Sequence, residues 1–372
     1  MLRPFTRDEW KRFPVGLVLT LAAIVAISLI CIASASWRPV AEGEWVNDGY
    51  HLKQLQWIGI SLVLGGIAAA LPYVKLLKYS WFVYLFGLSL LLAVAVMGKT
   101  VNGSKRWIDL KFMMLQPSEI VKLTVIVALA FYLRCCKTHR TLRGLVGPGL
   151  IVAAPMLLIL KQPDLGTSLC FVPVFFAMLY IAGAKKRHLG LMIGLGGGAA
   201  AIYGMFFMKA YQLGRLTAFL DPETVARAEG YHLIQSRTAI GAGGLLGNGF
   251  AHGAQNALGY LPENHTDFVF AVMGEEWGLI GCALVLLLYG LLITRILMIG
   301  MEVREPFGRL FCVGLATLIG FQVFVNVGMT VGMMPITGLT LPFFSYGGSS
   351  LFAMAIGIGL VINIRMRQVA FY

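Results

Sequence analysis

Ten long apolar stretches constrain this chain more than any other feature of its sequence. A helix needs roughly 20 apolar residues to cross a bilayer. The predicted spans are 14–36, 55–71, 79–97, 118–134, 148–161, 165–183, 188–208, 268–294, 307–334 and 345–364; the fifth is short, and an earlier start is left open. Apolar residues make up 58% of the chain and charged residues 13%, and no soluble domain has enough interior for that balance. We therefore predict an all-α integral membrane protein with ten transmembrane helices in a single domain, residues 1–372.

Basic residues predict the orientation of these spans, because Lys and Arg are enriched in cytoplasmic loops. If the N-terminus is inside, the inner segments hold 18 of the 30 basic residues and the outer segments hold 11, while Lys122 lies within a span. Both termini are therefore expected in the cytoplasm. The net charge of +13 is scattered among apolar runs, so it indicates topology and contact with anionic membrane lipids, and no nucleic-acid partner is expected.

The short outer loop 99–117 departs from this charge rule. It carries four cations against one acid, although the insertion bias disfavours cations on the outer side. The cations are Lys99, Lys105, Arg106 and Lys111, and the acid is Asp109. An anionic ligand on the outer face would explain these cations, and a topology set entirely by the other loops would explain them equally well.

The long outer connection, 209–266, is too long for a simple turn. Its segment 231–236 predicts a short interfacial helix, and the glycines of 241–249 predict a flexible loop after it. These glycines match neither common phosphate-binding fingerprint. The six cysteines have no metal-ligand spacing, so neither a zinc site nor a disulfide framework is expected.

Four polar motifs open even-numbered spans, which run from outside to inside and so begin at the outer end. They are Gln116-Pro117-Ser118-Glu119, Gln162-Pro163-Asp164, Leu261-Pro262-Glu263-Asn264-His265-Thr266-Asp267 and Ser345-Tyr346-Gly347-Gly348. Lys53, just before the second span, joins them. Helix N-termini attract anions, and cations add directed charge. The sequence therefore predicts an outward-facing site for a large anionic substrate, with charge supplied by Lys105, Arg106 and Lys122.

Each of these polar residues also has a purely structural interpretation. Asp164 and Glu119 fit N-terminal helix caps, and Glu119 with Lys122, one turn further on, fits a buried ion pair. Asp267 is harder to explain in this way, since it lies at the membrane boundary with no basic residue nearby in sequence. Desolvation would raise its pKa toward that of a general base unless a cation such as Lys122 met it. His265 beside it is a candidate proton relay.

Four deeper polar residues are assigned structural roles. Glu275 and Glu276 lie about two turns beyond Asp267 and are expected to form structural pairs. Gln322 and Asn326, one turn apart in the ninth span, are expected to form hydrogen bonds between helices.

Six motifs resemble those of the SEDS family, the bacterial shape, elongation, division and sporulation proteins. They span essentially the whole chain in family order: Lys105-Arg106-Trp107-Ile108-Asp109, Gln116-Pro117-Ser118-Glu119, Gln162-Pro163-Asp164-Leu165-Gly166-Thr167-Ser168, Gly230-Tyr231-His232-Leu233-Ile234-Gln235-Ser236, Leu261 through Phe268, and Ser345-Tyr346-Gly347-Gly348-Ser349. The length and the segment 249–256 are more similar to the elongation branch, RodA, than to the division branch, FtsW. Asn264 departs from the elongation pattern, where a basic residue is common, and this difference is expected to alter the contacts with the acceptor substrate.

The resemblance implies a ten-helix fold and a peptidoglycan glycosyltransferase that polymerises lipid II outside the bacterial cytoplasmic membrane for cell elongation and shape. It implies a class B penicillin-binding protein and other elongation-complex proteins as partners. The family's essential aspartate falls on Asp267. Its polar cavity residues fall on Lys53, Glu119 and Lys122, and Arg106 and Asp164 lie in the neighbouring motifs. Lys105 and His265 complete the expected substrate-binding set.

No cofactor is implied with certainty, and a divalent cation is left open. Two other functions compete with the enzyme: a lipid II flippase and a non-catalytic scaffold for a penicillin-binding protein. The polar residues are confined to the outer half, which argues against the flippase, because alternating access requires a site near the membrane midplane.

Overall fold

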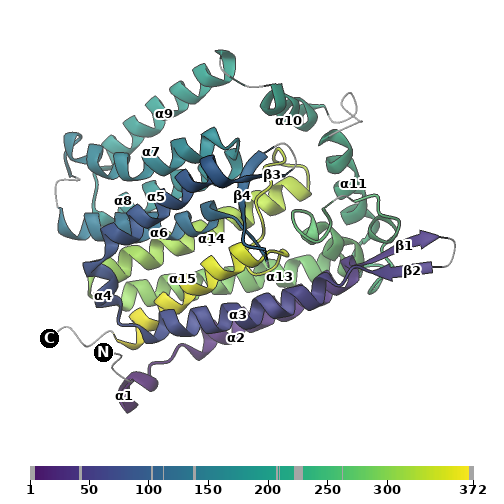
Figure 1. Cartoon of the computed structure of the whole chain (residues 1–372), viewed down its shortest axis with the longest axis horizontal. Coiled ribbons are helices and arrows are strands. Elements are labelled where there is room, and N and C mark those ends of the chain that lie inside the picture. Colours follow the sequence, from purple (N-terminus) through teal and green to yellow (C-terminus); the bar gives the residue numbers. More distant parts are fainter. Residues whose placement is uncertain are drawn as a thin grey trace.

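The computed structural model describes residues 5–41, 44–101, 104–111, 113–136, 140–206, 208, 210–221, 229–261 and 263–367. Pro262 of the motif before the eighth span and position 209, the expected start of the long outer loop, lie outside the described residues. The described part of the chain is built mainly from helices (Figure 1), which confirms the all-α prediction.

A helix occupies each of the ten predicted spans. The helices are α2 (Val15–Ala35), α3 (Tyr50–Ala70), α5 (Ser80–Met97), α6 (Pro117–Cys135), α7 (Val146–Lys161), α8 (Leu165–Ala182), α9 (Lys186–Phe206), α13 (Val269–Glu302), α14 (Pro306–Thr330) and α15 (Gly348–Met366). The fifth span begins earlier than predicted, because α7 follows directly on a 3-10 turn, Arg143–Leu145.

Within the described ranges, eight helices are long and apolar enough to cross a membrane. The two predicted spans outside this group are α6, which carries three charged residues, and α9. That α6 and α9 also cross the membrane stays a prediction.

The most buried helices, α6, α14 and α15, form the centre of the bundle. α15 packs along α3, and α14 packs against α13, α8 and α6. Gly65 of α3 faces Gly359 of α15, and two facing glycines let the backbones of neighbouring helices approach closely.

Two small antiparallel sheets, which the sequence analysis did not predict, lie in short loops. One pairs β1 (Trp37–Ala41) with β2 (Glu44–Asn47), and the other pairs β4 (Ser104–Asp109) with both β3 (Lys99–Val101) and β5 (Met114–Leu115). Pairing satisfies backbone groups that would otherwise be unpaired close to apolar surroundings. The second sheet fixes the path of the cation-rich loop, which therefore has a defined conformation.

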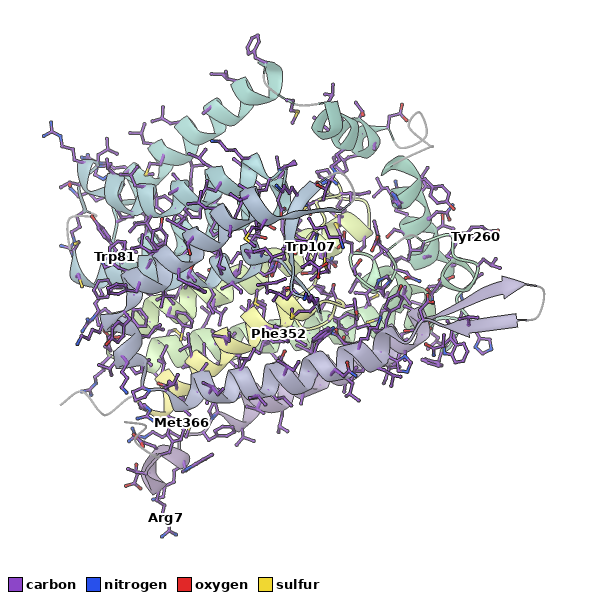
Figure 2. All side chains as sticks on the ribbon, in the orientation of Figure 1. Arg7, Trp81, Trp107, Tyr260, Phe352 and Met366 are labelled. Atoms are coloured by element: carbon purple, nitrogen blue, oxygen red, sulfur yellow. The ribbon has the colours of Figure 1, made fainter. Side chains whose placement is uncertain are left out.

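Short helices complete the chain. They are α1 (Arg7–Trp10), α4 (Tyr73–Lys78), α10 (Ala210–Leu220), α11 (Glu229–Ala242) and α12 (Ala254–Ala257). The short helix predicted at 231–236 lies within α11, which is longer than expected. In Figure 2, Arg7 and Met366 lie at one end of the molecule and Tyr260 at the other. The short helix α1 and the C-terminal end of α15 therefore lie at the same end.

α13 is broken at Gly278, whose φ of 64° and ψ of −161° are not helical. The glycine-rich segment 243–249 supplies hydrogen bonds at the break: the amides of Asn248 and Gly249 donate to Glu275 O and Glu276 O, each at 3.0 Å. The Leu279 amide donates to Gly244 O at 2.9 Å. The prediction of a flexible loop here is wrong, because the glycines serve close backbone packing. A Cβ atom at Gly247 would lie 2.1 Å from Glu276 O.

Replacing Gly359 by Ala tests the contact between α3 and α15. The added Cβ atom would lie 2.2 Å from the Gly65 carbonyl oxygen, so the helices must separate. We expect Gly359→Ala to lower the free energy of unfolding by about 1–3 kcal/mol. Thermal unfolding of the purified protein in detergent measures this change. Gly66→Ala is the matched control, because a Cβ there meets nothing within 4 Å, and equal melting curves for the two variants would contradict the packing described.

Candidate functional site

A cavity of about 610 Å³ opens where α3, α10, the start of α15 and the strands β4 and β5 meet the turn before α13 and the loop 337–340. Its charged lining residues are Lys53, Arg106, Arg215, Glu263 and Asp267. Aromatic side chains, among them Trp57, Trp107 and Tyr346, form apolar parts of the wall. The mixture of cations, acids and flat apolar surfaces suits a large amphiphilic anion.

Asp267 is partly buried in the turn before α13, and a hydrogen bond from α14 holds its backbone carbonyl. The fully buried Asn326 of α14 donates from Nδ2 to Asp267 O at 3.0 Å and to Leu339 O at 2.8 Å. Asn326 therefore holds the turn before α13 and the loop before α15, whereas the sequence analysis expected hydrogen bonds between helices. Gln322 differs, since neither of its side-chain polar atoms has a partner among the described residues.

Burial raises the pKa of Asp267 to about 6, and the nearby Glu263 carboxylate acts in the same direction. Arg215 and Arg106 lower the pKa but do not offset these effects. Among the described residues, no cation lies within ion-pair distance of Asp267, so Lys122 does not meet it. A carboxylate with a pKa in this range suits a general base near neutral pH.

His265 forms part of the cavity wall and makes no described contact with Asp267. Its ring stacks on Tyr50, with centroids 4.1 Å apart, and its Nδ1 lies 3.0 Å from Asn264 Oδ1. Burial lowers the pKa of His265, which favours the neutral imidazole. The proton relay expected of His265 stays a prediction. What the geometry adds is that its stacked ring forms part of the cavity wall.

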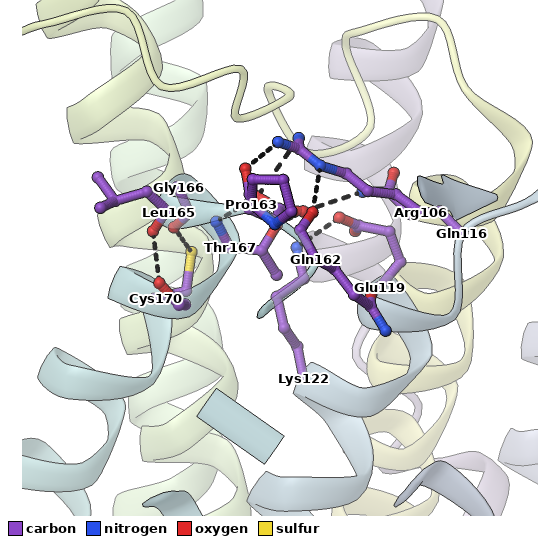
Figure 3. A network of polar contacts seen from close by, with 12 residues as sticks. Arg106, Gln116, Glu119, Lys122, Gln162, Pro163, Leu165, Gly166, Thr167 and Cys170 are labelled. Carbon is purple, nitrogen blue, oxygen red and sulfur yellow. Dashed lines mark hydrogen bonds and ion pairs between the residues drawn. The ribbon is translucent and has the colours of Figure 1, made fainter. Parts of the chain in front are cut away.

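Arg106 is held by the backbone carbonyls of Gln162 and Pro163 (Figure 3) and by the carboxylate of Asp164. Its Nε donates to Gln162 O at 3.0 Å, its second terminal nitrogen donates to Pro163 O, and Asp164 Oδ1 lies 3.8 Å from the guanidinium. Asp164 also caps α8, because its carboxylate accepts from the Thr167 amide at 3.1 Å. Asp164 therefore lies behind the cavity wall and orients the cation that lines it.

Glu119 and Lys122 form a buried ion pair of 2.8 Å on α6, at the spacing the sequence predicted. Neither residue lines the cavity. This geometry matches the structural alternative, and removing one partner of such a pair typically costs about 3–5 kcal/mol.

Lys105 also lies outside the cavity lining. Its Nζ donates to Ala95 O at 2.8 Å and to Val96 O at 3.2 Å, near the end of α5. Cations favour the C-terminal carbonyls of a helix, which explains this orientation. Lys53, by contrast, lies in the cavity lining, and its contact with the substrate stays a prediction.

Arg215 of α10 is a charged residue of the cavity lining that sequence reasoning missed. It is one of four basic residues in the connection 209–266, and no motif marks it. The cations that line the cavity are therefore Lys53, Arg106 and Arg215. Of the other two predicted cations, Lys105 contacts the end of α5 and Lys122 pairs with Glu119.

Within the described residues, no three His, Cys, Asp or Glu side chains come together as a metal site, and the six cysteines are free. The carboxylates that face the cavity are Glu263 and Asp267.

Comparison with known proteins gives one consistent result. Residues 15–369 match the FtsW/RodA/SpoVE family of cell cycle proteins. The chain is 36% identical over 352 residues to the peptidoglycan glycosyltransferase MrdB of Escherichia coli K12, covering 95% of this chain and 93% of MrdB. It is 38% identical over 364 residues to the probable peptidoglycan glycosyltransferase FtsW of Coxiella burnetii, covering 96% and 95%.

Solved structures agree. A chain of a peptidoglycan synthase complex, described for its coordination of polymerization and crosslinking, superposes with a TM-score of 0.80 at 33% identity, covering 95% of this chain and 98% of that one. The rod shape determining protein RodA of Thermus thermophilus superposes with a TM-score of 0.70 at 32% identity, covering 95% and 97%. This chain belongs to the FtsW/RodA/SpoVE family, the SEDS proteins, and within it resembles the RodA type.

Proposed function

We propose that this multi-pass inner-membrane protein is a peptidoglycan glycosyltransferase that polymerises lipid II into glycan strands, with Asp267 as general base. The observation that carries the proposal is Asp267 itself: a carboxylate with a pKa of about 6, in a large cavity lined by cations, in a chain related over nearly its whole length to peptidoglycan glycosyltransferases. The cavity lies on the extracytoplasmic side in this proposal, as the distribution of basic residues predicts.

In the reaction, Asp267 accepts the proton of the acceptor sugar's 4-hydroxyl group while that oxygen attacks the anomeric carbon of the donor. The new carbon–oxygen bond forms as the bond from the anomeric carbon to the pyrophosphate breaks. Undecaprenyl pyrophosphate leaves with the electron pair. A single displacement inverts an α-linked donor to a β-1,4 linkage, which needs one base and no carboxylate nucleophile.

The cations of the cavity suit the charge that develops on the leaving pyrophosphate. Arg106 is oriented by the Gln162 carbonyl and Asp164, so its position is fixed before substrate binds. The start of α15 adds a second source of positive potential: it has no side-chain cap, and its residues Gly348–Ser350 line the cavity. Lys53 and Arg215 extend this surface.

The biological role follows from the relatives. A related chain works in a peptidoglycan synthase complex that coordinates polymerization with crosslinking, and another is a rod shape determining protein. We therefore assign this chain to cell-wall elongation, working with a class B penicillin-binding protein that performs transpeptidation. Depletion of the protein is expected to round the cells, whereas filamentous cells would indicate a division role.

Asp267→Asn tests the general base. Asparagine keeps the shape of the side chain but cannot accept the proton, so we expect glycan polymerisation to fall by about 10²–10⁴-fold. The assay uses purified protein with its penicillin-binding partner and labelled lipid II in detergent, where no membrane side exists. Unchanged thermal unfolding of the variant is the control. If wild type makes no polymer with its partner, the enzyme proposal fails, and translocation of labelled lipid II in vesicles would support the flippase.

The pH dependence of polymerisation reports the ionisation of Asp267. Because the active base is deprotonated, turnover should fall as the pH drops through about 6, the pKa of Asp267. Glu263→Gln removes a negative charge that raises this pKa, so the acid limb should move to lower pH. A limb that moves to higher pH, or does not move, would contradict the assignment.

The two neighbouring cations of β4 are expected to differ in importance. Arg106→Gln removes charge from the cavity and should lower turnover by about 100-fold. Lys105→Gln removes a cation that contacts the end of α5, so its effect should be much smaller. Steady-state polymerisation of the two variants measures the difference, and equal losses would place Lys105 at the substrate.

A further inference from the structure

Glu275 is a fully buried carboxylate in the second turn of α13, and the sequence analysis expected it to form a structural pair. The structure shows a different partner. Its Oε1 accepts from the backbone N–H of Gln255 at 2.8 Å, and its Oε2 accepts from the backbone N–H of Asn256 at 3.2 Å. No cation lies within ion-pair distance of it in the described ranges of the chain. The carboxylate therefore binds the backbone of α12, outside its own helix.

The surrounding backbone is shaped for this contact. A Cβ atom at Gly253 would lie 2.5 Å from Glu275 Oε2, so the segment reaches the carboxylate only because that residue is glycine. The break of α13 at Gly278 binds segment 243–249 at the same place. Glu275 thus joins the broken helix to the loop that leads back to the cavity.

A chain of hydrogen bonds continues from α12 to the cavity wall. Asn264 Nδ2 donates to Asn256 Oδ1 at 2.7 Å, and Asn264 Oδ1 lies 3.0 Å from His265 Nδ1. The Tyr346 amide donates to His265 O at 2.9 Å. His265 and Tyr346 line the cavity, and Asp267 follows two residues later in the same turn.

We propose that Glu275 is a positioning residue for the glycosyl transfer: acting through α12 and Asn264, it fixes His265 and the turn that carries Asp267. The proposal rests on the proposed function of the cavity. A carboxylate suits this role because both of its oxygens accept, and hydrogen bonds to a charged acceptor are stronger than neutral ones. Glutamine would present one oxygen and one amino group to two N–H donors, so one contact must be lost.

The first test compares Glu275→Gln with a matched control, Glu305→Gln, in the full-length protein. Glu305 is also a carboxylate that accepts a backbone amide, that of Gly308 at 2.8 Å, but it caps α14 far from the cavity. Hydrogen exchange measured by mass spectrometry reports on the segment 253–265. We expect protection of the Gln255 and Asn256 amides to fall by about 10- to 100-fold in Glu275→Gln and to stay unchanged in Glu305→Gln. Unchanged exchange in Glu275→Gln would overturn the proposal.

The second test measures the rate of polymerisation and asks whether the effects of changing Glu275 and Asn264 depend on each other. Glu275→Gln should lower kcat at least about tenfold with little change in KM for lipid II, because the turn that carries the base is displaced while the cations remain. Asn264→Ala breaks the same chain further on. The double variant should be no slower than the slower single variant, since both changes act through one path. Losses that multiply would overturn the proposal.

These readouts separate the two proposals. If wild type forms no glycan, the proposed function fails, while the exchange experiment still decides whether Glu275 holds α12. If Glu275→Gln does not fold, Asn264→Ala decides the question alone. It should lower kcat and leave the exchange of Gln255 and Asn256 as in wild type, and normal kcat in that variant would overturn the proposal.

Discussion

The cavity end of this molecule depends on one constraint: a backbone that leaves helical geometry within a membrane protein must find hydrogen-bond partners in the protein itself. α13 breaks at Gly278, and the segment 243–249 supplies those partners. The contact requires glycine on both sides, since a Cβ at Gly278 would lie 2.5 Å from the Gly247 amide nitrogen. Once the loop is fixed there, α12 and the turn of Asp267 take their places.

Much of the fold is predictable from the sequence because a bilayer imposes a fixed length on every crossing. Each predicted span contains a helix, and Pro117 and Asp164 mark the starts of α6 and α8 as their residue types suggest. The β4 sheet and the glycine segment were not predictable in the same way. Glycine permits both mobility and close backbone contact, and only the partner surface, here the break at Gly278, decides between them.

The sequence predicts which residue types gather at the site, but it predicts less well in which direction their side chains point. Sequence reasoning brings Asp267, Lys53 and Arg106 to one end of the bundle, but it cannot tell where a long side chain points. Lys105 and Arg106 are neighbours, yet one contacts the end of α5 and the other the cavity, because successive side chains of a strand point to opposite faces. Arg215 carries no motif, so only the packing of α10 reveals it.

The pairing of Lys122 with Glu119 bears on the chemistry of Asp267. An ion pair between Lys122 and Asp267 would favour the ionised carboxylate and lower its pKa, which would make a weaker base. Lys122 is instead neutralised within α6, at 2.8 Å from Glu119. Arg106 is likewise shared with Asp164 and two carbonyls, so its charge acts on Asp267 only at a distance. Glu119 and Asp164 thus engage two of the cations, Lys122 and Arg106, and burial together with the Glu263 charge keeps the pKa of Asp267 raised although Arg215 and Arg106 act against it. Positive charge for a pyrophosphate can therefore lie beside a carboxylate that still accepts a proton.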